Sequence, residues 1–422
     1  MNVADSNDAL VALVDYAPPQ APTLDSLQRL RDRLVPRFLR RTREPTVHDD
    51  RLERAALATV EDYVAVPDCD VVVDRLDAAI DGWLADDAPN ARILLVVLPP
   101  CETRGLIERA ARRRGFEVLE EPGRDALAEP GGVPGRAFDA DAGAVLAIPR
   151  LERWFVRHRH GLGLARSLLG EIAATDRRCL VGVNSWGWRF VAKAARADLV
   201  LPPPVTLPAF DAARLRDWLV DLARADGTDG VAVRAIEGGE DVLAADEGGE
   251  PRHDFLRELA ARGLGIPWVC WQLWRRGLRT LPAKDEEVGE EVGDGEAGEG
   301  GDASAGGDPR TDSRRIDDDV PARRRAADDD HTMWVTHDAP LRLPSGHEHD
   351  ACLVLHALLI HAFLEPAELE RTVPLVGESG IVRALERAGF VERDGSAFRC
   401  RPAAYPSVRA ALDDAGYPLP PV

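Results

Sequence analysis

The sequence predicts an α/β protein in which a mainly parallel sheet is flanked by helices and is followed by a separate C-terminal module. The strongest observation is the continuous aliphatic run Ile93–Leu98, which is typical of a strand buried on both faces. Short strand patterns then alternate with helical patterns as far as residue 208, and such alternation indicates a doubly wound sheet. A stretch rich in acidic residues and glycine separates this part from a compact helical segment that ends in a hairpin.

The composition is that of a globular chain with a strongly acidic surface. The 422 residues predict roughly two or three domains, and 45% of them are hydrophobic, which is enough to fill a core. The chain has 73 acidic and 53 basic residues, and its net charge of −20 disfavours a general attraction to nucleic acid or anionic membranes. Only Lys193 and Lys284 are lysines, and this preference for arginine, with abundant Asp, Glu, Ala and Val, resembles the composition of halophilic archaeal proteins.

The sequence carries no signal for a membrane or for export. No apolar run approaches the roughly 18 residues that a membrane span requires, and residues 1–8 lack the basic and apolar regions of a signal peptide. The six cysteines include no CxxC pair, which fits reduced, buried thiols better than a disulfide framework or a zinc site. We therefore expect a cytoplasmic protein. The cysteines are Cys69, Cys101, Cys179, Cys270, Cys352 and Cys400.

Hydrophobic periodicity predicts the elements of the α/β part in order. Amphipathic helices are predicted at 24–41, 50–66 and 74–84, and the last of these leads into strand 93–98. The helix after that strand ends at Gly115. Further strands are predicted at 116–119, 144–148, 179–183 and 205–207, with a helical stretch at 164–172. Later helices are predicted at 211–223, 252–261 and 268–279, and the last is expected to be buried because it carries Trp268, Trp271 and Trp274.

The clearest boundary in the chain is an acidic segment. Residues 285–330 hold seventeen acidic and six basic side chains, eight glycines and almost no aliphatic residues. Such a segment cannot bury enough apolar area to offset the entropy lost on ordering, so a disordered linker is predicted over 285–345. Its basic clusters, at 314–315 and 323–325, are flanked by aspartates, which favours a solvated polyampholyte over a nucleic-acid patch.

The segment after the linker has the pattern of a winged helix-turn-helix. Helices are predicted at 351–363, 366–373 and 378–388, and the third ends at Gly389, a candidate for a left-handed cap. The turn pair Asp394-Gly395 between two short β patterns then predicts a hairpin, and a last helix follows at 405–415.

This order of parts resembles the AAA-type P-loop ATPases of the origin-recognition or STAND kind. The resemblance covers residues 70–282 and 350–415, and it depends on element order and on residues at strand ends, such as Pro149 to Trp154 and Asn184-Ser185-Trp186. It implies a P-loop-NTPase-like sheet with a helical lid and a C-terminal winged helix. The predicted division is an N-terminal helical region (1–69), an α/β domain (70–208), a lid-like region (209–284), the linker (285–345) and the winged helix (346–422).

The phosphate-binding motif of that family is absent. GxxxxGK[ST] requires a lysine followed by Ser or Thr, whereas Lys193 precedes Ala194 and Lys284 precedes Asp285. The loop in the corresponding place, Pro99 to Gly105, has two prolines instead of glycines, and Glu102 in it would repel a phosphate. We therefore expect no nest of backbone amides there, and no bound cofactor. Arg104 could imitate the missing lysine, although a surface residue at a helix start is the simpler interpretation.

The second catalytic element is missing as well. A hydrolase would present Asp and Glu at the end of strand 144–148, but Pro149 and Arg150 stand there and Glu152 is displaced. Glu152 is expected to be a partner for nearby arginines. Asn184 lies where the family has a sensor residue and could contact a ligand, although a turn or helix cap is the favoured interpretation. Arg104, Glu152 and Asn184 therefore mark a vestigial site.

A histidine-rich segment is a candidate for metal binding. His347, His349, Cys352, His356 and His361 lie within fifteen residues, and Cys352 and His356 share a helix face. The segment lacks a second ligand pair at firm spacing, so packed histidines are favoured and no metal is predicted.

The predicted winged helix carries the remaining functional signal. Its third helix would present Arg383 and Arg387, and its hairpin would present Arg393, Arg399 and Arg401 to nucleic acid. Residues 350–422 nevertheless hold ten acidic side chains against seven basic ones. DNA binding and protein docking therefore remain equal alternatives.

Three functions are consistent with these observations. The favoured one is a non-enzymatic regulator or scaffold with a protein partner. The second is a DNA-binding transcriptional or replication-associated regulator, and the third is an ATPase with an atypical phosphate loop. The sequence leaves the identity of the partner and the oligomeric state open.

Overall fold

The longest strands of the protein, β3 (Ile93–Leu98) and β6 (Cys179–Asn184), lie side by side at the centre of a six-stranded sheet. They pair in parallel, with Ile93 opposite Cys179 and Leu98 opposite Asn184. Every residue of β6 is buried, because helices cover both faces of the sheet. The structure is a computed structural model that describes residues 10–21, 53–54, 69–88, 91–123, 127, 138, 145–225, 232–280 and 333–422.

The sheet has the strand order β1-β7-β3-β6-β5-β4. The outer strands are β1 (Val11–Ala12), β4 (Glu117–Val118), β5 (Leu146–Ile148) and β7 (Val205–Thr206). All neighbours pair in parallel except β1, which runs antiparallel to β7. The predicted α/β class with a mainly parallel sheet flanked by helices is therefore confirmed.

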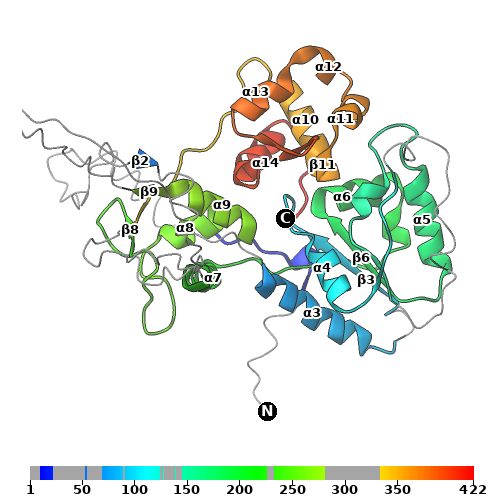
Figure 1. Ribbon diagram of the computed structural model, residues 1–422, viewed down its shortest axis with the longest axis horizontal. Coiled ribbons are helices and arrows are strands. Elements are labelled where there is room, and N and C mark those ends of the chain that lie inside the picture. The colour runs from blue at the N-terminus through cyan, green and yellow to red at the C-terminus, as the bar shows by residue number, and fades with distance from the viewer. Residues whose placement is uncertain are drawn as a thin grey trace, which may run out of the picture.

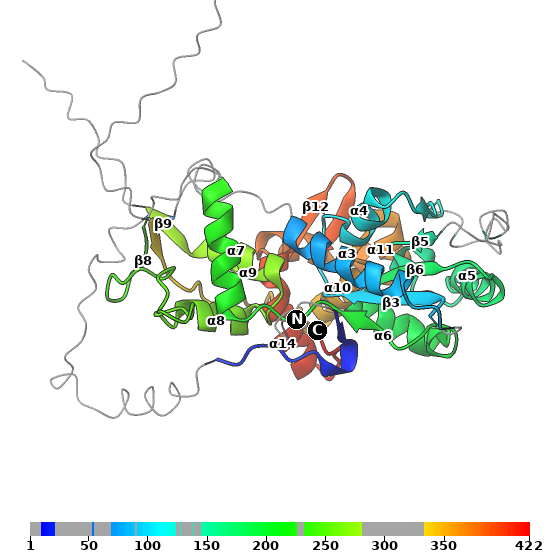
Figure 2. The ribbon, with the colours of Figure 1, turned by 90° about the horizontal axis from the view of Figure 1, so that it is seen from below.

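Helices flank both faces of this sheet. The helices α3 (Asp70–Leu84) and α4 (Leu106–Arg113) lie on one side, and α6 (Ser185–Ala194) lies on the other (Figure 2). The helix α5 (Gly163–Ala174) contacts η6 (Leu151–Trp154), a short 3-10 helix that follows β5. Because α4 begins directly after the loop that leaves β3, its position determines where that loop lies.

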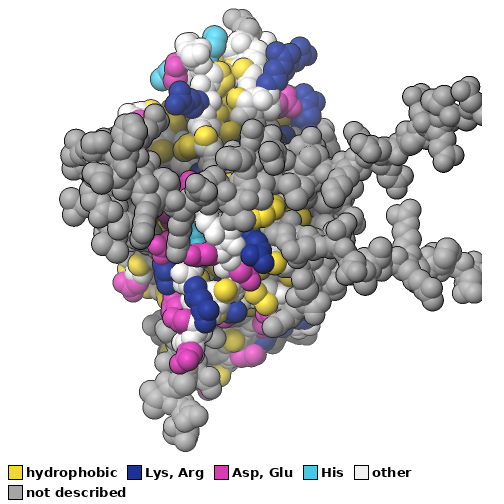
Figure 3. All heavy atoms as spheres, turned by 90° about the vertical axis from the view of Figure 1, so that its left-hand side faces the viewer, with side chains coloured by type: hydrophobic (Ala, Val, Ile, Leu, Met, Phe, Trp, Pro, Cys, Tyr) yellow, Lys and Arg dark blue, Asp and Glu magenta, His cyan; other side chains and the backbone are white. Residues whose placement is uncertain are grey.

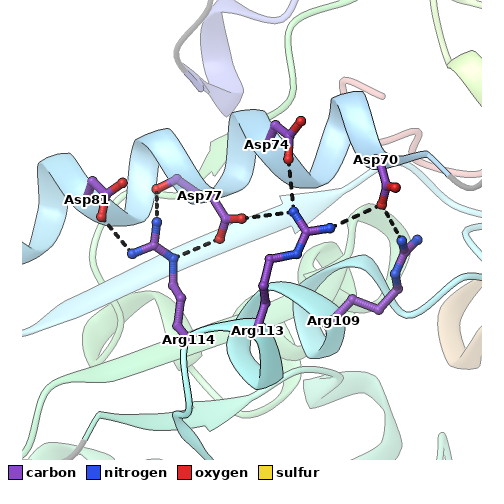
Figure 4. Close-up of polar contacts among 7 residues, drawn as sticks. All are labelled: Asp70, Asp74, Asp77, Asp81, Arg109, Arg113 and Arg114. Atoms are coloured by element: carbon purple, nitrogen blue, oxygen red, sulfur yellow. Dashed lines mark hydrogen bonds and ion pairs between the residues drawn. The ribbon is translucent and has the colours of Figure 1, made fainter.

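A ladder of ion pairs holds α4 against α3 (Figure 4). The α3 side consists of four aspartates at helical spacing, Asp70, Asp74, Asp77 and Asp81. Arg113 lies 2.9 Å from Asp74, and Arg114 lies 2.7 Å from both Asp77 and Asp81. Arg109 pairs with Asp70 at the end of the ladder nearest the loop. The hydrogen bond from Arg114 lowers the pKa of the Asp81 carboxyl.

A second region contains helices and a small sheet, whereas the sequence predicts only helices over 209–284. Its helices are α7 (Ala212–Ala225), α8 (Phe255–Arg262) and α9 (Pro267–Gly277). Its sheet has the order β2-β9-β10-β8, formed by β2 (Glu53–Arg54), β8 (Val233–Ala235), β9 (Leu278–Thr280) and β10 (Met333–Val335). The predicted burial of Trp268, Trp271 and Trp274 on α9 is confirmed, since their exposed fractions are 7%, 4% and 3%.

Three predicted boundaries differ from the structure. Strand β2 lies inside the predicted helix 50–66, β9 shortens the predicted helix 268–279, and β10 lies inside the predicted linker 285–345. The reason is pairing between distant segments, because β10 pairs with β8 and β9 and buries all three of its side chains. The predicted helix 24–41 and residues 285–332 lie outside the described residues.

The C-terminal module consists of five helices and a three-stranded sheet (Figure 1). The helices are α10 (Glu348–His361), α11 (Pro366–Thr372), α12 (Val376–Ser379), α13 (Ile381–Arg387) and α14 (Tyr405–Asp414). The hairpin strands β12 (Val391–Asp394) and β13 (Ala397–Cys400) are joined by β11 (Phe363–Leu364), which the sequence did not predict. The predicted helix 378–388 is divided at Gly380, whose φ of 61° interrupts the helical conformation.

The described surface shows no large region of one charge on the face drawn in Figure 3, where acidic and basic side chains are interspersed with apolar ones. Within the described ranges, no helix is both long enough and apolar enough to cross a bilayer.

Candidate functional site

A cavity of about 90 Å³ lies at the carboxyl ends of β3, β5 and β6. In open α/β sheets, ligands bind outside the carboxyl ends of the strands, so this cavity is where a ligand site would be expected. Leu98, Pro149 and Asn184 line it from the strand ends. Phe363 and Arg399 line it from the C-terminal module, which therefore covers the ends of the strands.

The loop after β3 forms an amide nest, and a side chain of the same loop fills it. The carboxylate of Glu102 accepts hydrogen bonds from the backbone N–H groups of Arg104, Gly105 and Leu106. These amides lie at the start of α4, where the helix dipole favours a negative charge. Burial raises the pKa of the Glu102 carboxyl, although the amides and the charge of Arg150 oppose this shift.

The expectation that this loop has no amide nest is therefore wrong. The sequence argument depended on the two prolines, but the loop turns at Cys101 and Gly105, whose φ angles are 63° and 62°. These two left-handed residues allow three successive amides to point at one carboxylate. The charge of Glu102, which the sequence argument treated as repelling a ligand, is the group that the nest holds.

The two arginines near this loop differ in position. Arg104 is exposed and lines a neighbouring cavity of about 360 Å³, together with Trp268 and Trp271 of α9. Arg150 lies against the loop, with its guanidinium 3.4 Å from where a Cβ on Gly105 would lie. The cation that faces the nest is thus Arg150, which sequence reasoning noted only as a replacement for a catalytic Asp.

Glu152 and Asn184 are joined below the cavity. The Glu152 side chain is 4% exposed and accepts a hydrogen bond from the Asn184 backbone N–H at 3.2 Å. Burial raises the pKa of the Glu152 carboxyl to about 7, and the charges of Arg150 and Arg153 and hydrogen bonds from backbone amides oppose the shift. Gly187 makes this packing possible, because a Cβ there would lie 3.0 Å from both the Glu152 Cβ and the Ile360 carbonyl oxygen.

Asn184 caps α6, as the favoured interpretation of the sequence held. Its Oδ1 accepts from the Gly187 backbone N–H at 2.8 Å, and its Nδ2 donates to the Ile360 carbonyl at 3.2 Å. Both ends of the side-chain amide are therefore used inside the protein. The second bond also links β6 to α10 of the C-terminal module.

Arg153 is one of the residues that anchor the C-terminal module, and sequence reasoning missed it. Its side chain is 2% exposed, and its Nη1 donates to the Phe363 carbonyl at 2.8 Å. Its guanidinium lies 3.6 Å from the centre of the Phe363 ring, which is a close cation–π contact. Trp186 adds a hydrogen bond of 3.2 Å to the Tyr405 hydroxyl. The only sequence signal for this contact is an arginine that closely follows a predicted strand.

The histidine-rich segment packs against the α/β domain. His356 Nδ1 lies 2.9 Å from Arg157 Nη1, and burial, followed by the charge of Arg157, lowers the pKa of His356 to about 3. His361 Nε2 accepts from the Arg157 backbone N–H at 3.2 Å. Cys352, which would share a metal with His356, instead donates to the Ala411 carbonyl at 3.8 Å. Among the residues that the structure describes, no group of three or more His, Cys, Asp or Glu side chains could hold a metal.

The five arginines predicted to contact nucleic acid fall into two groups. The hairpin arginines are paired: Arg393 with Glu386 at 2.8 Å, Arg399 with Glu392 at 2.7 Å and Asp394 at 2.8 Å, and Arg401 with Glu392 at 3.6 Å. Arg383 and Arg387 of α13 are exposed, and no ion pair is recorded for either of them within the described ranges. Two of the five arginines are thus available to a partner, whereas the other three already pair with carboxylates.

Comparison with known proteins adds little to this geometry. No protein-family model matches the chain, and no curated protein matches it. Among solved structures, the RuvB Holliday junction branch migration motor of Thermotoga maritima is 12% identical with a TM-score of 0.25, covering 83% of this chain and 95% of that chain. A mutant of the same RuvB is 12% identical with a TM-score of 0.24, covering 86% of this chain and 96% of that chain. With TM-scores this low, function has to be argued from the site itself.

Proposed function

We propose that this protein is a non-enzymatic cytoplasmic regulator or scaffold that docks a protein partner and is built on an AAA-like α/β domain without ATPase activity. The observation that carries the proposal is the position of Glu102. Its carboxylate lies on the amides at the start of α4, where a P-loop would hold a phosphate. A nucleotide phosphate would have to displace an anion that is covalently part of the loop.

The size and the lining of the cavity support the same proposal. Sites for small molecules usually enclose about 300 Å³ or more. The cavity at the strand ends has only about 90 Å³, whereas the neighbouring cavity, which Glu102 also lines, has about 360 Å³. The C-terminal module occupies the remaining space through Phe363, Asp394 and Arg399. Glu152, the nearest acid to the end of β5, lines the cavity, and one of its carboxylate oxygens accepts a hydrogen bond from the Asn184 backbone N–H.

Calorimetry with Mg·ATP tests this proposal on the full-length protein. We expect no binding with a Kd below about 100 μM, which corresponds to roughly −5.5 kcal/mol. A tighter Kd in the wild-type protein would overturn the proposal and would favour an ATPase with an atypical phosphate loop. Arg150→Ala serves as a matched variant. If the wild-type protein bound Mg·ATP and this variant did not, the nucleotide would lie at this loop.

DNA binding through the C-terminal module is the second candidate function. The observation that favours it is the exposure of Arg383 and Arg387, one turn apart on α13, in an arrangement of helices and hairpin that resembles a winged helix. Replacing this pair by Ala should abolish mobility shifts by full-length protein. The pair Arg399 and Arg401 is the matched control, because both already pair with Glu392 or Asp394 and their replacement should weaken binding less. Equal losses from both pairs, or no shift by the wild-type protein, would count against this function.

A further inference from the structure

Two cysteines that are distant in the sequence lie close together at the edge of the cavity. Cys101 belongs to the loop after β3, and Cys400 is the last residue of β13 in the C-terminal hairpin. Both line the cavity at the strand ends, and Cys400 Sγ interacts with the Cys101 side chain as well as donating to the Arg401 carbonyl at 3.6 Å. The two thiols therefore lie in direct contact across the boundary between the α/β domain and the C-terminal module.

The surroundings of the two sulfur atoms differ. Cys101 is half-buried and also lines the cavity of about 360 Å³, together with the exposed Arg104. Reactive cysteines are partly exposed, because the oxidant has to reach the sulfur. Cys400 is only 3% exposed. The hydrogen bond to Cys101, together with burial, raises the pKa of the Cys400 thiol well above its ordinary range.

The other four cysteines do not combine a partly exposed sulfur with a neighbouring thiol. Cys179, Cys270 and Cys352 are buried, and each donates to a backbone carbonyl, of Arg177, Leu259 and Ala411 respectively. Cys69 is 2% exposed, but it lines the same larger cavity as Cys101. Cys69 is thus the rival partner that an experiment has to distinguish from Cys400.

We propose that Cys101 and Cys400 are a peroxide-sensitive pair that forms a disulfide between the loop after β3 and the C-terminal hairpin. The Cys101 thiolate attacks one oxygen of hydrogen peroxide, the O–O bond breaks, and Cys101 becomes a sulfenic acid as hydroxide leaves. The Cys400 sulfur then attacks the Cys101 sulfur, an S–S bond forms, and the sulfenic oxygen leaves as water with the proton of Cys400. In total, the two thiols lose two electrons and two protons, and one peroxide becomes two waters.

The bond would lock the C-terminal module over the ends of the strands. Arg153, Asn184 and Trp186 hold the module by non-covalent contacts, which can open and close. A disulfide beside them would prevent opening until a thiol reductant removes it. This inference does not depend on the proposed function, because it requires neither nucleotide nor DNA.

Thiol counting on the full-length protein tests the inference. The protein is treated with hydrogen peroxide, unfolded, labelled with a maleimide and digested without reductant for mass spectrometry. We expect the labelled cysteines to fall from six to four, with a cross-linked peptide that contains Cys101 and Cys400 and that dithiothreitol separates. Oxidation should also raise the melting temperature, and dithiothreitol should reverse the rise.

Two variants make the outcome decisive. Cys400→Ser should leave Cys101 as a sulfenic acid that dimedone traps, and it should abolish the rise in melting temperature. Cys179→Ser, a matched change at a buried cysteine of β6, should form the cross-link as the wild-type protein does. Three outcomes would overturn the proposal. The first is that all six cysteines are still labelled after peroxide, and the second is a cross-link from Cys101 to Cys69. The third is irreversible oxidation of Cys101 while Cys400 remains a free thiol.

Discussion

At the scale of single residues, one carboxylate determines the state of the loop after β3. Glu102 satisfies three backbone N–H groups that no helical carbonyl can reach, since they lie just before α4 and at its first residue. A phosphate would satisfy the same donors. The presence of an internal anion therefore explains how this loop keeps its shape without lysine or bound nucleotide.

Removing that anion should destabilise the protein measurably. Glu102→Ala leaves backbone donors unsatisfied in a half-buried place, which costs about 1–3 kcal/mol of the free energy of unfolding. Glu102→Gln keeps one oxygen acceptor and should lose less. Glu108→Ala is the control, because its pair with Arg112 on the surface of α4 is worth about 0.5 kcal/mol at most. Urea unfolding checks the order, and an equal loss for Glu102→Ala and Glu108→Ala would contradict it.

The lowered pKa of His356 predicts that this residue destabilises the folded protein in mild acid. Its pKa in the folded protein is about 3, below the roughly 6.5 of an unfolded chain. Below about pH 6.5 the unfolded state binds the proton more readily, so stability falls as pH falls towards the folded pKa, by at most about 1.4 kcal/mol per pH unit. Glu152 acts in the opposite direction, because its pKa in the folded protein is raised to about 7. Its contribution to the free energy of unfolding decreases as pH rises towards that value.

A comparison of variants separates the two contributions. His356→Gln removes the histidine contribution and keeps that of Glu152, so its stability should fall less between about pH 6.5 and about pH 4 than that of the wild-type protein. His349→Gln changes an exposed histidine of the same helix and should retain the wild-type slope. Equal slopes for all three proteins in urea unfolding would show that His356 is not held neutral at this interface.

At the scale of elements, the ladder between α3 and α4 positions the loop that Glu102 fills. Arg114 is its best buried cation, with a side chain 18% exposed and bonds to Asp77 and Asp81. Arg114→Ala should cost about 1.5–3 kcal/mol of unfolding free energy, because bonds between charged groups are lost. The loss should be smaller in high salt, which screens partly exposed charges. Arg112→Ala, at a 70% exposed side chain, is the control and should change stability by about 0.5 kcal/mol or less.

The elements that sequence reasoning could predict are those stabilised by local pattern. The aliphatic runs of β3 and β6 and the tryptophans of α9 each determine an element within a few residues. Strands β10 and β11 have three and two residues, and they depend on partners far away in the chain, so no local pattern indicates them. The amide nest was missed for a related reason, since a left-handed conformation at a cysteine, Cys101, has no sequence signature.

At the scale of the whole molecule, the C-terminal module closes the site that the sheet creates. The contacts responsible join residues that are distant in sequence, such as Arg153 with Phe363 and Asn184 with Ile360. Periodicity and motif spacing contain no information on such pairs. The separation into an α/β domain and a C-terminal module could therefore be predicted, while their docking across the cavity could not.

Arg153→Ala should loosen this docking specifically. The substitution leaves the Phe363 and His361 carbonyls without the bonds that Arg153 donates and removes the cation–π contact, at a cost of about 3 kcal/mol or more. Because the module then opens more often, amide hydrogen exchange should accelerate in β11 and at the start of α4, which face each other across the cavity. The α3–α4 ladder lies apart from these contacts, so exchange in α3 should stay unchanged.

Arg150→Ala distinguishes loosened docking from a general effect of losing charge. Arg150 lies in the same segment, but its side chain is 28% exposed and its pair with Glu121 spans 3.9 Å, so exchange in β11 should remain at the wild-type rate. If Arg153→Ala accelerated exchange in α3 as much as in β11, the arginine would stabilise the whole fold instead of the docked module. If neither variant changed exchange in β11, the module would be held by the remaining contacts of β6 with α10 and of α6 with α14, and Arg153 would not be its anchor.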